Sequence, residues 1–550
     1  MKSMKEGPNK MKSMKEGPTK MKSMKKLVTL LFSLVMLCAF AIPVMADEMY
    51  SITINGAVAG HTYTAYQVFK GVYSSDNNIE YLSDVEWGEG VKSNELLVAL
   101  NAKDKNDNYN AIFGDAFKDA ANAEDVANVV ASFGDQSAKL DEFAHIVGKH
   151  LKEEQKSGSA TIPAGDTTKT GTIPNLSAGY YFVKDAGEIN NGEIATKFLV
   201  KVVGNANVTV KAQAPTLKKE IVKENGTVNG TSANVGDKIT FKLTANVPDM
   251  ASFDTYTFTI SDTLSKGLTF DANTVAVNIG STPLVADSNY TLTPPDADNT
   301  FTIKFTKDQL GDKVKHADGA EIVVTYKATL NSNALTVDKE TNTAKLTYSN
   351  NPDGTGTGTT PDAHVYVYDF DLTVDKFDGI KNDTVNEESK RLEGATFILY
   401  KEKDGKKFYY EQDTTTEAVT WNETKNNATK FNTDKNGKAT FKGLEEGTYY
   451  LEEIKAPKGY NTLKEPVKVE IKAAYNDDGT LNTTATDCKL KHDADNGHYY
   501  QVQAIANKAG AVLPSTGGIG TTIFYVLGSI MALGTAVLLI AKKRMNGQER

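Results

Sequence analysis

Short stretches in which apolar and polar residues alternate recur along most of this chain. A period of two places successive side chains on opposite faces of an extended strand, so that one face can be buried. Gly, Asn, Asp and Pro, which favour turns, separate the stretches. The pattern predicts strands at residues 50–54, 62–69, 178–183, 197–203, 238–244, 301–305, 321–326 and 392–400, and another at 449–460 that ends in a turn. We therefore expect a mainly β protein.

One internal segment has a different period. Its apolar residues follow helical spacing and predict a helix with one buried stripe: Leu140, Phe143, Ala144, Val147 and Leu151. At about 150 residues per domain, three domains fit the chain. We expect tandem immunoglobulin-like (Cna-type) β-sandwiches, the first with this helical insert. The expected segments are an extension with a signal peptide (1–46), a first domain (47–212), a middle domain (213–368), a third domain (369–510) and a tail (511–550).

Both ends of the chain carry export signals. After a short polar repeat, Lys25 and Lys26 precede the apolar run 27–42, and the small residue Ala46 ends a typical leader. Near the other end, the apolar run 519–541 exceeds the ~20 residues that a helix needs to cross a bilayer. The basic residues 542–544 would hold the end of that helix in the cytoplasm. We expect an exported precursor with a C-terminal transmembrane helix.

Composition narrows the class of protein. Of 2 cysteines only Cys488 lies outside the leader, so we expect no internal disulfide. A net charge of -9 with no basic stripe argues against a nucleic-acid partner.

Two patterns that could indicate a ligand site do not fit one. His145 and His150 are five residues apart, which does not fit a helical metal pair. The glycine-rich residues 354–360 lack a P-loop lysine. We expect no metal and no cofactor.

Ionisable residues occupy strand positions whose neighbours on the same face are apolar. Lys219 lies between Leu217 and Ile221 in this alternation, and Asp262 lies between Ile260 and Leu264. Continuing the alternation Ala344, Leu346, Tyr348 gives Asn350. The third domain repeats the arrangement with three residues: Lys376, Glu453 and Asn507. Lys218 and Asn351, the immediate neighbours, would lie on the opposite faces. Alternatively, these residues lie on edge strands, and the charged ends of their side chains reach water.

Burial would change the chemistry of these groups. Burying an unpaired charge costs several kcal/mol, so a buried lysine loses its proton and a buried acid keeps one. A neutral amine is a nucleophile, and a neutral carboxylic acid can polarise an amide carbonyl. A lysine and an asparagine held beside such an acid can expel ammonia and leave an amide bond between the two side chains.

A pentapeptide precedes the C-terminal apolar run: Leu513, Pro514, Ser515, Thr516 and Gly517. It resembles the cell-wall sorting signal that sortases read in Gram-positive bacteria. The chain as a whole resembles the shaft (major) pilins, which class C sortases polymerise and which form Lys–Asn isopeptide bonds by themselves. The resemblance implies cleavage between Thr516 and Gly517. It also implies neighbouring pilin subunits, minor pilins and, through a housekeeping sortase, peptidoglycan as partners.

The third domain resembles the CnaB type. It carries the family's E-box at Tyr449, Leu451, Glu453, Ala456, Pro457, Gly459 and Tyr460, with Ile454 where threonine is usual. The resemblance implies that Glu453 promotes a Lys376–Asn507 bond. In the middle domain it implies Lys219 and Asn350 as the pair and Asp262 as the acid.

One family element departs from its pattern. Shaft pilins carry Tyr-Pro-Lys at the end of the first domain, whereas residues 208–213 here read Val-Thr-Val-Lys-Ala-Gln. Lys211 is the nearest candidate for the lysine that accepts the next subunit, with Lys201 and Lys184 as alternatives. We expect a polymerised pilus subunit that is not itself an enzyme, located in the cell wall. The alternative is a singly anchored adhesin that binds a host or matrix ligand.

Overall fold

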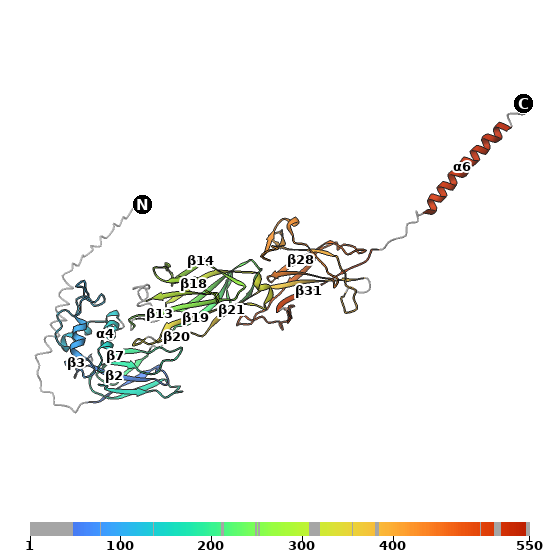
Figure 1. The fold of residues 1–550 in the computed structure, drawn as a ribbon. Helices are drawn as coiled ribbons and strands as arrows, with labels where there is room; N and C mark the ends of the chain where they lie inside the picture. The colour runs from blue at the N-terminus through green and yellow to red at the C-terminus, as the bar shows by residue number, and fades with distance from the viewer. Residues whose placement is uncertain are drawn as a thin grey trace, which may run out of the picture. The chain divides into compact units, whose positions relative to one another are not determined.

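A computed structural model describes residues 48–76, 79–135, 137–210, 214–247, 250, 253–306, 320–354, 356–379, 384–495, 497–510 and 519–545. The chain divides into two compact units. One contains the described residues up to Gly134, with Ile146–Ala186 and Lys197–Val210. The other contains Asp135–His145, Gly187–Thr196 and the described residues from 214 onward. Most regular structure is strand, as Figure 1 shows, and the predicted mainly β fold is confirmed.

The first unit contains two sheets, the helices Ser93–Leu100 and Ala123–Ala131, and the end of a third helix that begins in the other unit. One sheet has the order β5-β1-β8, with β1 (Tyr50–Asn55), β5 (Thr170–Leu176) and β8 (Ala206–Thr209). The other has the order β3-β2-β6-β7, with β4 paired to β2: β2 (Thr62–Asp76), β3 (Ile79–Trp87), β4 (Gly158–Thr161), β6 (Gly179–Asp185) and β7 (Lys197–Val202). The helices are α2 (Ser93–Leu100), α3 (Ala123–Ala131) and α4 (Ala138–Lys149). The predicted helical stripe lies in α4 and buries Phe143 and Val147.

The middle part of the second unit is a sandwich of two sheets. The first sheet has the order β10-β9-β12-β18-β14-β15. Its strands are β9 (Leu217–Lys223), β10 (Gly226–Val228), β12 (Lys238–Asn246), β14 (Leu268–Ile279), β15 (Thr282–Pro283) and β18 (Glu321–Leu330). The facing sheet has the order β11-β21-β19-β13-β17-β16, with β20 paired to β19. Its strands are β11 (Gly230–Ser232), β13 (Thr257–Leu264), β16 (Thr291–Thr293), β17 (Thr300–Thr306), β19 (Glu340–Ser349), β20 (Thr357–Thr359) and β21 (Ala363–Tyr368).

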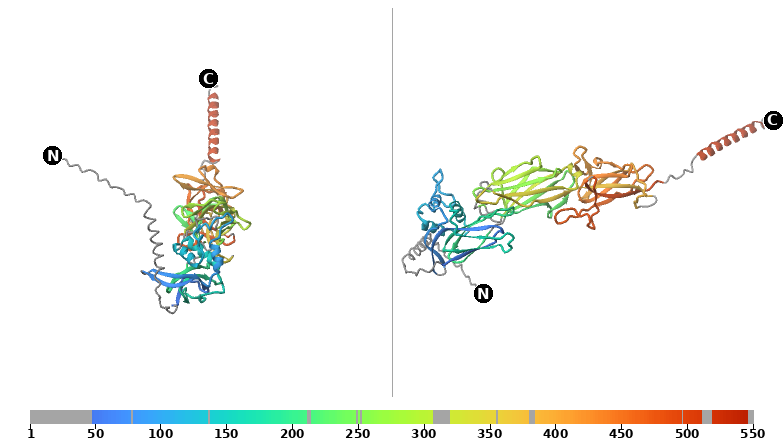
Figure 2. Two further views of the ribbon diagram at one scale, coloured as in Figure 1. Left: turned by 90° about the vertical axis from the view of Figure 1, so that its left-hand side faces the viewer. Right: turned by 60° about the horizontal axis from the view of Figure 1, so that its bottom comes forward.

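The alternation seen in the sequence becomes the inner surface of this sandwich. Along β12, Phe241, Leu243 and Ala245 are buried and the residues between them are not. A single hydrophobic core between the sheets runs from Ile221 to Val367 in the sequence. Figure 1 shows β14 and β18 in one layer and β13 and β19 in the other, and Figure 2 gives two further views of these layers.

The third part of the chain has its own core between two further sheets. One sheet has the order β27-β22-β31-β30, with β22 (Phe370–Asp378), β27 (Lys438–Leu444), β30 (Lys491–Asp493) and β31 (His498–Asn507). The other has the order β25-β24-β23-β28-β29, with β26 paired to β23: β23 (Thr396–Lys403), β24 (Lys406–Gln412), β25 (Val419–Asn422), β26 (Phe431–Asn432), β28 (Gly447–Lys455) and β29 (Val467–Ile471). The first strand β22 and the last strand β31 are parallel neighbours.

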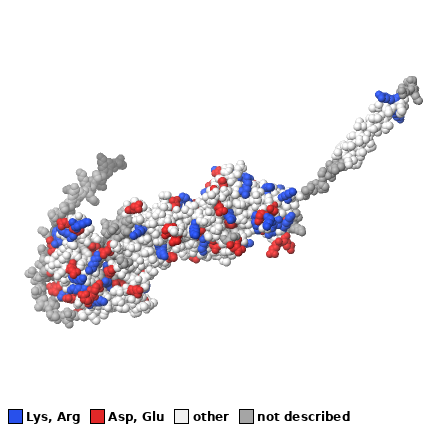
Figure 3. All heavy atoms as spheres, viewed as in Figure 1, with Lys and Arg blue, Asp and Glu red and all other residues white. Residues whose placement is uncertain are grey.

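The C-terminal apolar run forms one helix, α6 (Ile519–Met545). Its segment Thr522–Met545 is long and apolar enough to cross a membrane, and none of it is buried in the protein. Figure 3 shows an uncharged surface along this helix with basic side chains near its end, where Lys542, Lys543 and Arg544 lie. The helix has the length, surface and charge expected of a membrane anchor.

Candidate functional site: two buried lysine–acid–asparagine clusters

The third domain brings its three predicted residues together in the core. Lys376 comes from β22, Asn507 from the neighbouring β31, and Glu453 from β28 in the facing sheet. Their exposed fractions are 0%, 1% and 5%. Asn507 Nδ2 donates to both oxygens of Glu453, at 2.8 and 3.0 Å. Lys376 Nζ lies 4.0 Å from Glu453 Oε1 and donates to the carbonyl of Ile505 at 2.9 Å. The carboxyl therefore touches the amide directly.

Burial shifts this pair towards its neutral forms. Loss of water lowers the pKa of Lys376 to about 8, against the opposing attraction of Glu453. The same desolvation raises the pKa of Glu453, although the backbone N–H of Leu463, the lysine and Asn507 each favour its ionised form. Both shifts move the pair towards an amine and a carboxylic acid. The result is the neutral amine that attack on an amide requires.

The middle domain builds its cluster across the two sheets. Lys219 is the third residue of β9, and Asp262 comes from β13 in the facing sheet. The lysine Nζ donates to Asp262 Oδ2 at 2.6 Å, and both side chains are fully buried. Desolvation lowers the pKa of Lys219 and raises that of Asp262, so burial shifts this pair towards its neutral forms as well.

Two further residues complete this cluster, and sequence reasoning missed both. Tyr326 comes from β18 and Asn342 from β19, each fully buried. The hydroxyl of Tyr326 donates to Asp262 Oδ2 at 2.7 Å and accepts from Lys219 Nζ at 2.9 Å. Asn342 Nδ2 donates to the same hydroxyl at 2.7 Å. The amide beside the lysine is therefore that of Asn342.

The predicted partner Asn350 does not reach this cluster, which corrects the pairing. In the register of β13 with β19, Asp262 lies opposite Ala344 and Leu264 lies opposite Asn342. Asn350 is six residues beyond Ala344, or about 20 Å along an extended chain. It follows the last residue of β19, where its carbonyl accepts the N–H of Ala195 at 2.9 Å. Strand alternation identified the correct face of β19, but not the position along it.

The proposed inter-subunit elements lie partly outside the described residues. Lys211 and the sorting pentapeptide at residues 513–517 are not described. The residue before Lys211, Val210, is fixed by a hydrogen bond in which its N–H donates to the carbonyl of Asn55 at 2.8 Å. Of the alternatives, Lys184 on β6 pairs with Glu153 at 3.0 Å, and Lys201 on β7 donates to the carbonyl of Glu80 at 3.2 Å.

Other candidate sites have ordinary structural partners. His145 Nε2 lies 2.9 Å from Asp254 Oδ1, and His150 Nδ1 lies 2.8 Å from the carbonyl of Ile146. Among the described residues, no group of three or more His, Cys, Asp or Glu side chains is placed to hold a metal ion. Figure 3 shows basic and acidic side chains intermixed over the visible face.

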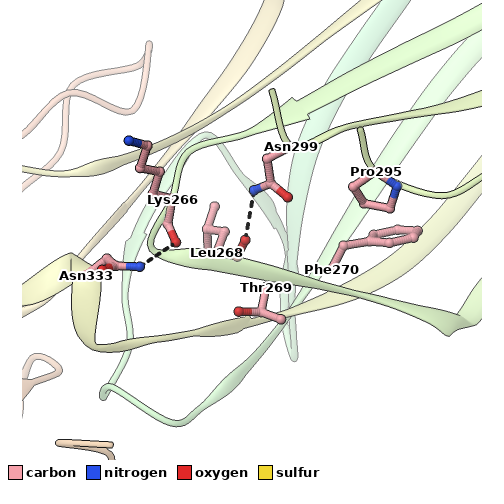
Figure 4. A pocket seen from close by; sticks show the side chains of 7 residues that line it. All are labelled: Lys266, Leu268, Thr269, Phe270, Pro295, Asn299 and Asn333. Carbon is pink, nitrogen blue, oxygen red and sulfur yellow. Dashed lines mark hydrogen bonds between the residues drawn. The ribbon is translucent and has the colours of Figure 1, made fainter. Parts of the chain in front are cut away.

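A surface hollow in the middle domain is lined by Lys266, Leu268, Thr269, Phe270, Pro295, Asn299 and Asn333 (Figure 4). Two of its polar side chains form hydrogen bonds with the backbone of the surrounding chain. Asn333 donates to the carbonyl of Lys266 at 3.1 Å, and Asn299 donates to that of Leu268 at 3.2 Å. These amides are engaged with the backbone and do not converge on a common point. The two buried clusters remain the chemically distinctive groups.

Family models match three parts of the chain. Residues 235–352 match the Gram-positive pilin backbone subunit 2, Cna-B-like domain, and include Asp262, Tyr326 and Asn342. Residues 376–489 match SpaA, a prealbumin-like fold domain, and include Lys376 and Glu453. Residues 505–547 match the LPXTG cell wall anchor motif. The acid of each cluster therefore lies in a matched domain, whereas Lys219 precedes the first match and Asn507 lies in the anchor match.

The chain is also similar to individual proteins. The trypsin-resistant surface T6 protein of Streptococcus pyogenes serotype M6 is 23% identical over 90% of this chain and 95% of its own length. The solved T6 backbone pilin of that organism is 18% identical, covers 84% of this chain and 94% of that one, and has a TM-score of 0.46. The group B streptococcus pilus 2b backbone protein is 26% identical, covers 54% of this chain and 99% of that one, and has a TM-score of 0.40. The three family matches place this chain among the Gram-positive pilin backbone subunits that carry an LPXTG cell-wall anchor.

Proposed function

We propose that this chain is the repeating subunit of a covalently polymerised pilus, stabilised by two internal amide bonds. The observation that carries the proposal is the occurrence, in one wall-anchored chain, of two buried clusters that each contain a lysine, an acid and an asparagine amide. A structural role in a cell-surface pilus follows from the pilin-backbone and anchor matches. The amide bonds formed in these clusters would let the subunit resist extension.

The internal bonds join Lys219 to Asn342 and Lys376 to Asn507. In each reaction the lysine Nζ attacks Cγ of the asparagine, a C–N bond forms, and Nδ2 leaves as ammonia. Two protons leave the lysine ammonium: one ends on the ammonia and one on the acid. Asp262 and Glu453 pass the proton that they have taken up to the ammonia or to water and are not consumed. Each domain reacts once, because its lysine and asparagine are used up.

Assembly uses the two ends of the subunit. A class C sortase thiol attacks the carbonyl carbon of Thr516 and releases the segment that begins at Gly517. A lysine amine of the next subunit, with Lys211 as the first candidate, then displaces the thiol and forms an amide. Minor pilins join the same polymer, and a housekeeping sortase transfers the finished fibre to peptidoglycan. Within the precursor, after the signal peptide, we assign the domains 47–212, 213–368 and 369–510, followed by the sorting tail 511–550.

Electrophoresis of cell-wall extracts tests assembly. We expect a high-mass ladder that survives boiling in detergent and disappears in Thr516→Ala. Lys211→Ala should abolish the ladder too, whereas the matched change Lys218→Ala in β9 should preserve it. A single monomer band from the unaltered chain would instead indicate a singly anchored adhesin. A normal ladder from Lys211→Ala would transfer the acceptor role to Lys184 or Lys201.

Mass spectrometry tests the internal bonds. The mature chain should weigh less than its sequence by two ammonia molecules, and digestion should yield two branched peptides. One should contain Lys219 and Asn342, and the other Lys376 and Asn507. A full sequence mass would overturn both bonds.

A further inference from the structure

Tyr326 occupies the centre of the middle-domain cluster. Its hydroxyl lies 2.9 Å from the attacking nitrogen, Lys219 Nζ, and 2.7 Å from the leaving nitrogen, Asn342 Nδ2. It also donates its own proton to Asp262 Oδ2 at 2.7 Å. A phenol has one donor and two acceptor sites, and these three contacts use all of them. Among the described residues, this is the group that contacts the nucleophile, the acid and the leaving group together.

Asp262 does not make the contact that the reaction needs at the amide. Its Oδ2 is shared by Lys219 and Tyr326, while Oδ1 has no hydrogen-bond partner among the described residues. In the third domain, by contrast, Glu453 reaches the asparagine amide with both oxygens. A proton on its way from the amine to the departing nitrogen therefore needs an intermediary in the middle domain and none in the third.

The tyrosine ring is held so that the hydroxyl cannot turn away. Tyr326 is fully buried and packs on Phe241, Phe270 and Phe301, with ring centroids 5.4, 5.5 and 4.9 Å away. Burial and the neighbouring Asp262 raise the pKa of Tyr326 well above its usual value. The phenol therefore stays protonated and remains able to donate.

We propose that Tyr326 is a catalytic proton relay for the Lys219–Asn342 bond, an inference that rests on the proposed function. As the tetrahedral intermediate collapses, the phenol gives its proton to Asn342 Nδ2, which leaves as ammonia. The phenol takes back a proton from the lysine nitrogen that has formed the new C–N bond. Asp262 holds the other lysine proton. Every proton is accounted for, and Tyr326 ends as it began.

The rate of bond formation tests the relay. The full chain is synthesised in a cell-free system with detergent micelles for α6, and timed samples are stopped with acid, digested and analysed for the branched peptides. In Tyr326→Phe the Lys219–Asn342 bond should form about 10²- to 10⁴-fold more slowly, the usual contribution of a proton-transferring group. Tyr348→Phe, which removes a buried hydroxyl from the same core, should not slow it. The rate at which the Lys376–Asn507 bond forms in the same chain serves as the internal reference.

A second substitution separates proton transfer from packing. Site-specific 3,5-difluorotyrosine at position 326 keeps the ring and its hydroxyl but makes the phenol more acidic. A relay predicts that the bond-forming rate changes in this variant, whereas a purely structural hydroxyl predicts no change. This readout stands even if Tyr326→Phe fails to fold.

The outcomes distinguish the relay from the bond itself. Absence of the Lys219–Asn342 peptide from the unaltered chain would overturn the proposed bond. A bond that forms in the unaltered chain and at the same rate in both Tyr326 variants would overturn only the relay. A slower Lys219–Asn342 bond together with an unchanged Lys376–Asn507 bond supports it.

Discussion

The middle and third domains hold the same three functional groups in different strand geometries. In the third domain Lys376 and Asn507 lie on neighbouring parallel strands of one sheet, and the acid comes from the facing sheet. In the middle domain Lys219 lies on one sheet, whereas the acid and Asn342 lie on the other. The Lys376–Asn507 bond would link two strands that are already hydrogen-bonded in one sheet. The Lys219–Asn342 bond would link the two sheets across the core.

The difference also decides which group touches the amide. In the third domain Asn507 contacts the glutamate of the facing sheet directly, and no intermediary is needed. The middle domain places a shorter acid near the lysine, and a tyrosine fills the remaining distance. One chemistry can therefore be reached from two sandwich topologies, provided that each supplies a dry site and a path for the proton.

Removing either acid should give the largest effect and show whether the clusters are independent. Asp262→Ala should prevent only the Lys219–Asn342 bond, and Glu453→Ala only the Lys376–Asn507 bond. Each variant loses about 4–5 kcal/mol of loop-closure stabilisation and also leaves a buried lysine without its acid, which costs about 3–5 kcal/mol. Intact mass and thermal unfolding of each variant check this. Loss of both bonds from one substitution would show that the domains are coupled.

Replacing the two candidate asparagines tests the corrected pairing. Asn342→Ala should abolish the middle-domain bond and cost about 4–5 kcal/mol, since the covalent loop is no longer closed. Asn350→Ala is the matched control, because it removes a buried amide near the same strand but should leave the branched peptide intact. Digestion and mass spectrometry give the answer directly. A bond that persists in Asn342→Ala and vanishes in Asn350→Ala would restore the pairing first predicted from the sequence.

The third domain without its bond should become more stable at alkaline pH. In Asn507→Ala the lysine stays an amine whose pKa in the folded chain is about 8, below its unfolded value of 10.5. Between these values the unfolded chain binds more protons, so stability rises with pH, by up to about 3 kcal/mol. Urea unfolding across this range measures the gain. The unaltered chain, whose lysine nitrogen is an amide, should lack this rise, and an equal rise in both would argue against the bond.

Removing a helix cap in the first unit should change the free energy of unfolding by an ordinary amount and serves for comparison. Asn122 caps α3 by accepting the N–H of Asp125 at 2.9 Å. Asn122→Ala should cost about 1 kcal/mol, the typical value of such a cap. Both branched peptides should form as in the unaltered chain, because the cap lies in another unit. Denaturant unfolding and mass spectrometry together check the two expectations.

Sequence alone predicted the faces of the strands better than their register. Alternation placed Lys219, Asp262, Lys376, Glu453 and Asn507 on core faces, and all five are buried there. It also identified the correct face of β19, because residues 342 and 350 differ by an even number. Which of the two lies beside Asp262 depends on how β19 pairs with β13, and that register is set by packing between distant segments.

Tyr326 illustrates a second limit of the sequence. It ends the predicted strand 321–326, and an aromatic residue there reads as ordinary core. Its hydroxyl gains a role only when β18 faces β13 and β19 across the sandwich. An unusual signal could have drawn attention to Asn342, since an amide also occupies a core-facing position two residues before Ala344. The strand pattern alone could not decide between Asn342 and Asn350, because both continue the same alternation.

The position of Asn342 in the first part of β19 has a mechanical consequence. When a fibre is pulled, the load would pass from Lys219 to Asn342 and from Lys376 to Asn507 through covalent bonds. Residues 343–375, which include the rest of β19 and all of β21, would lie between these bonds and outside both closed loops. This segment alone could lengthen within the two domains, by at most about 110 Å when fully extended. The two domains would then resist extension everywhere except in this short segment, which would lengthen when β21 is pulled from β19.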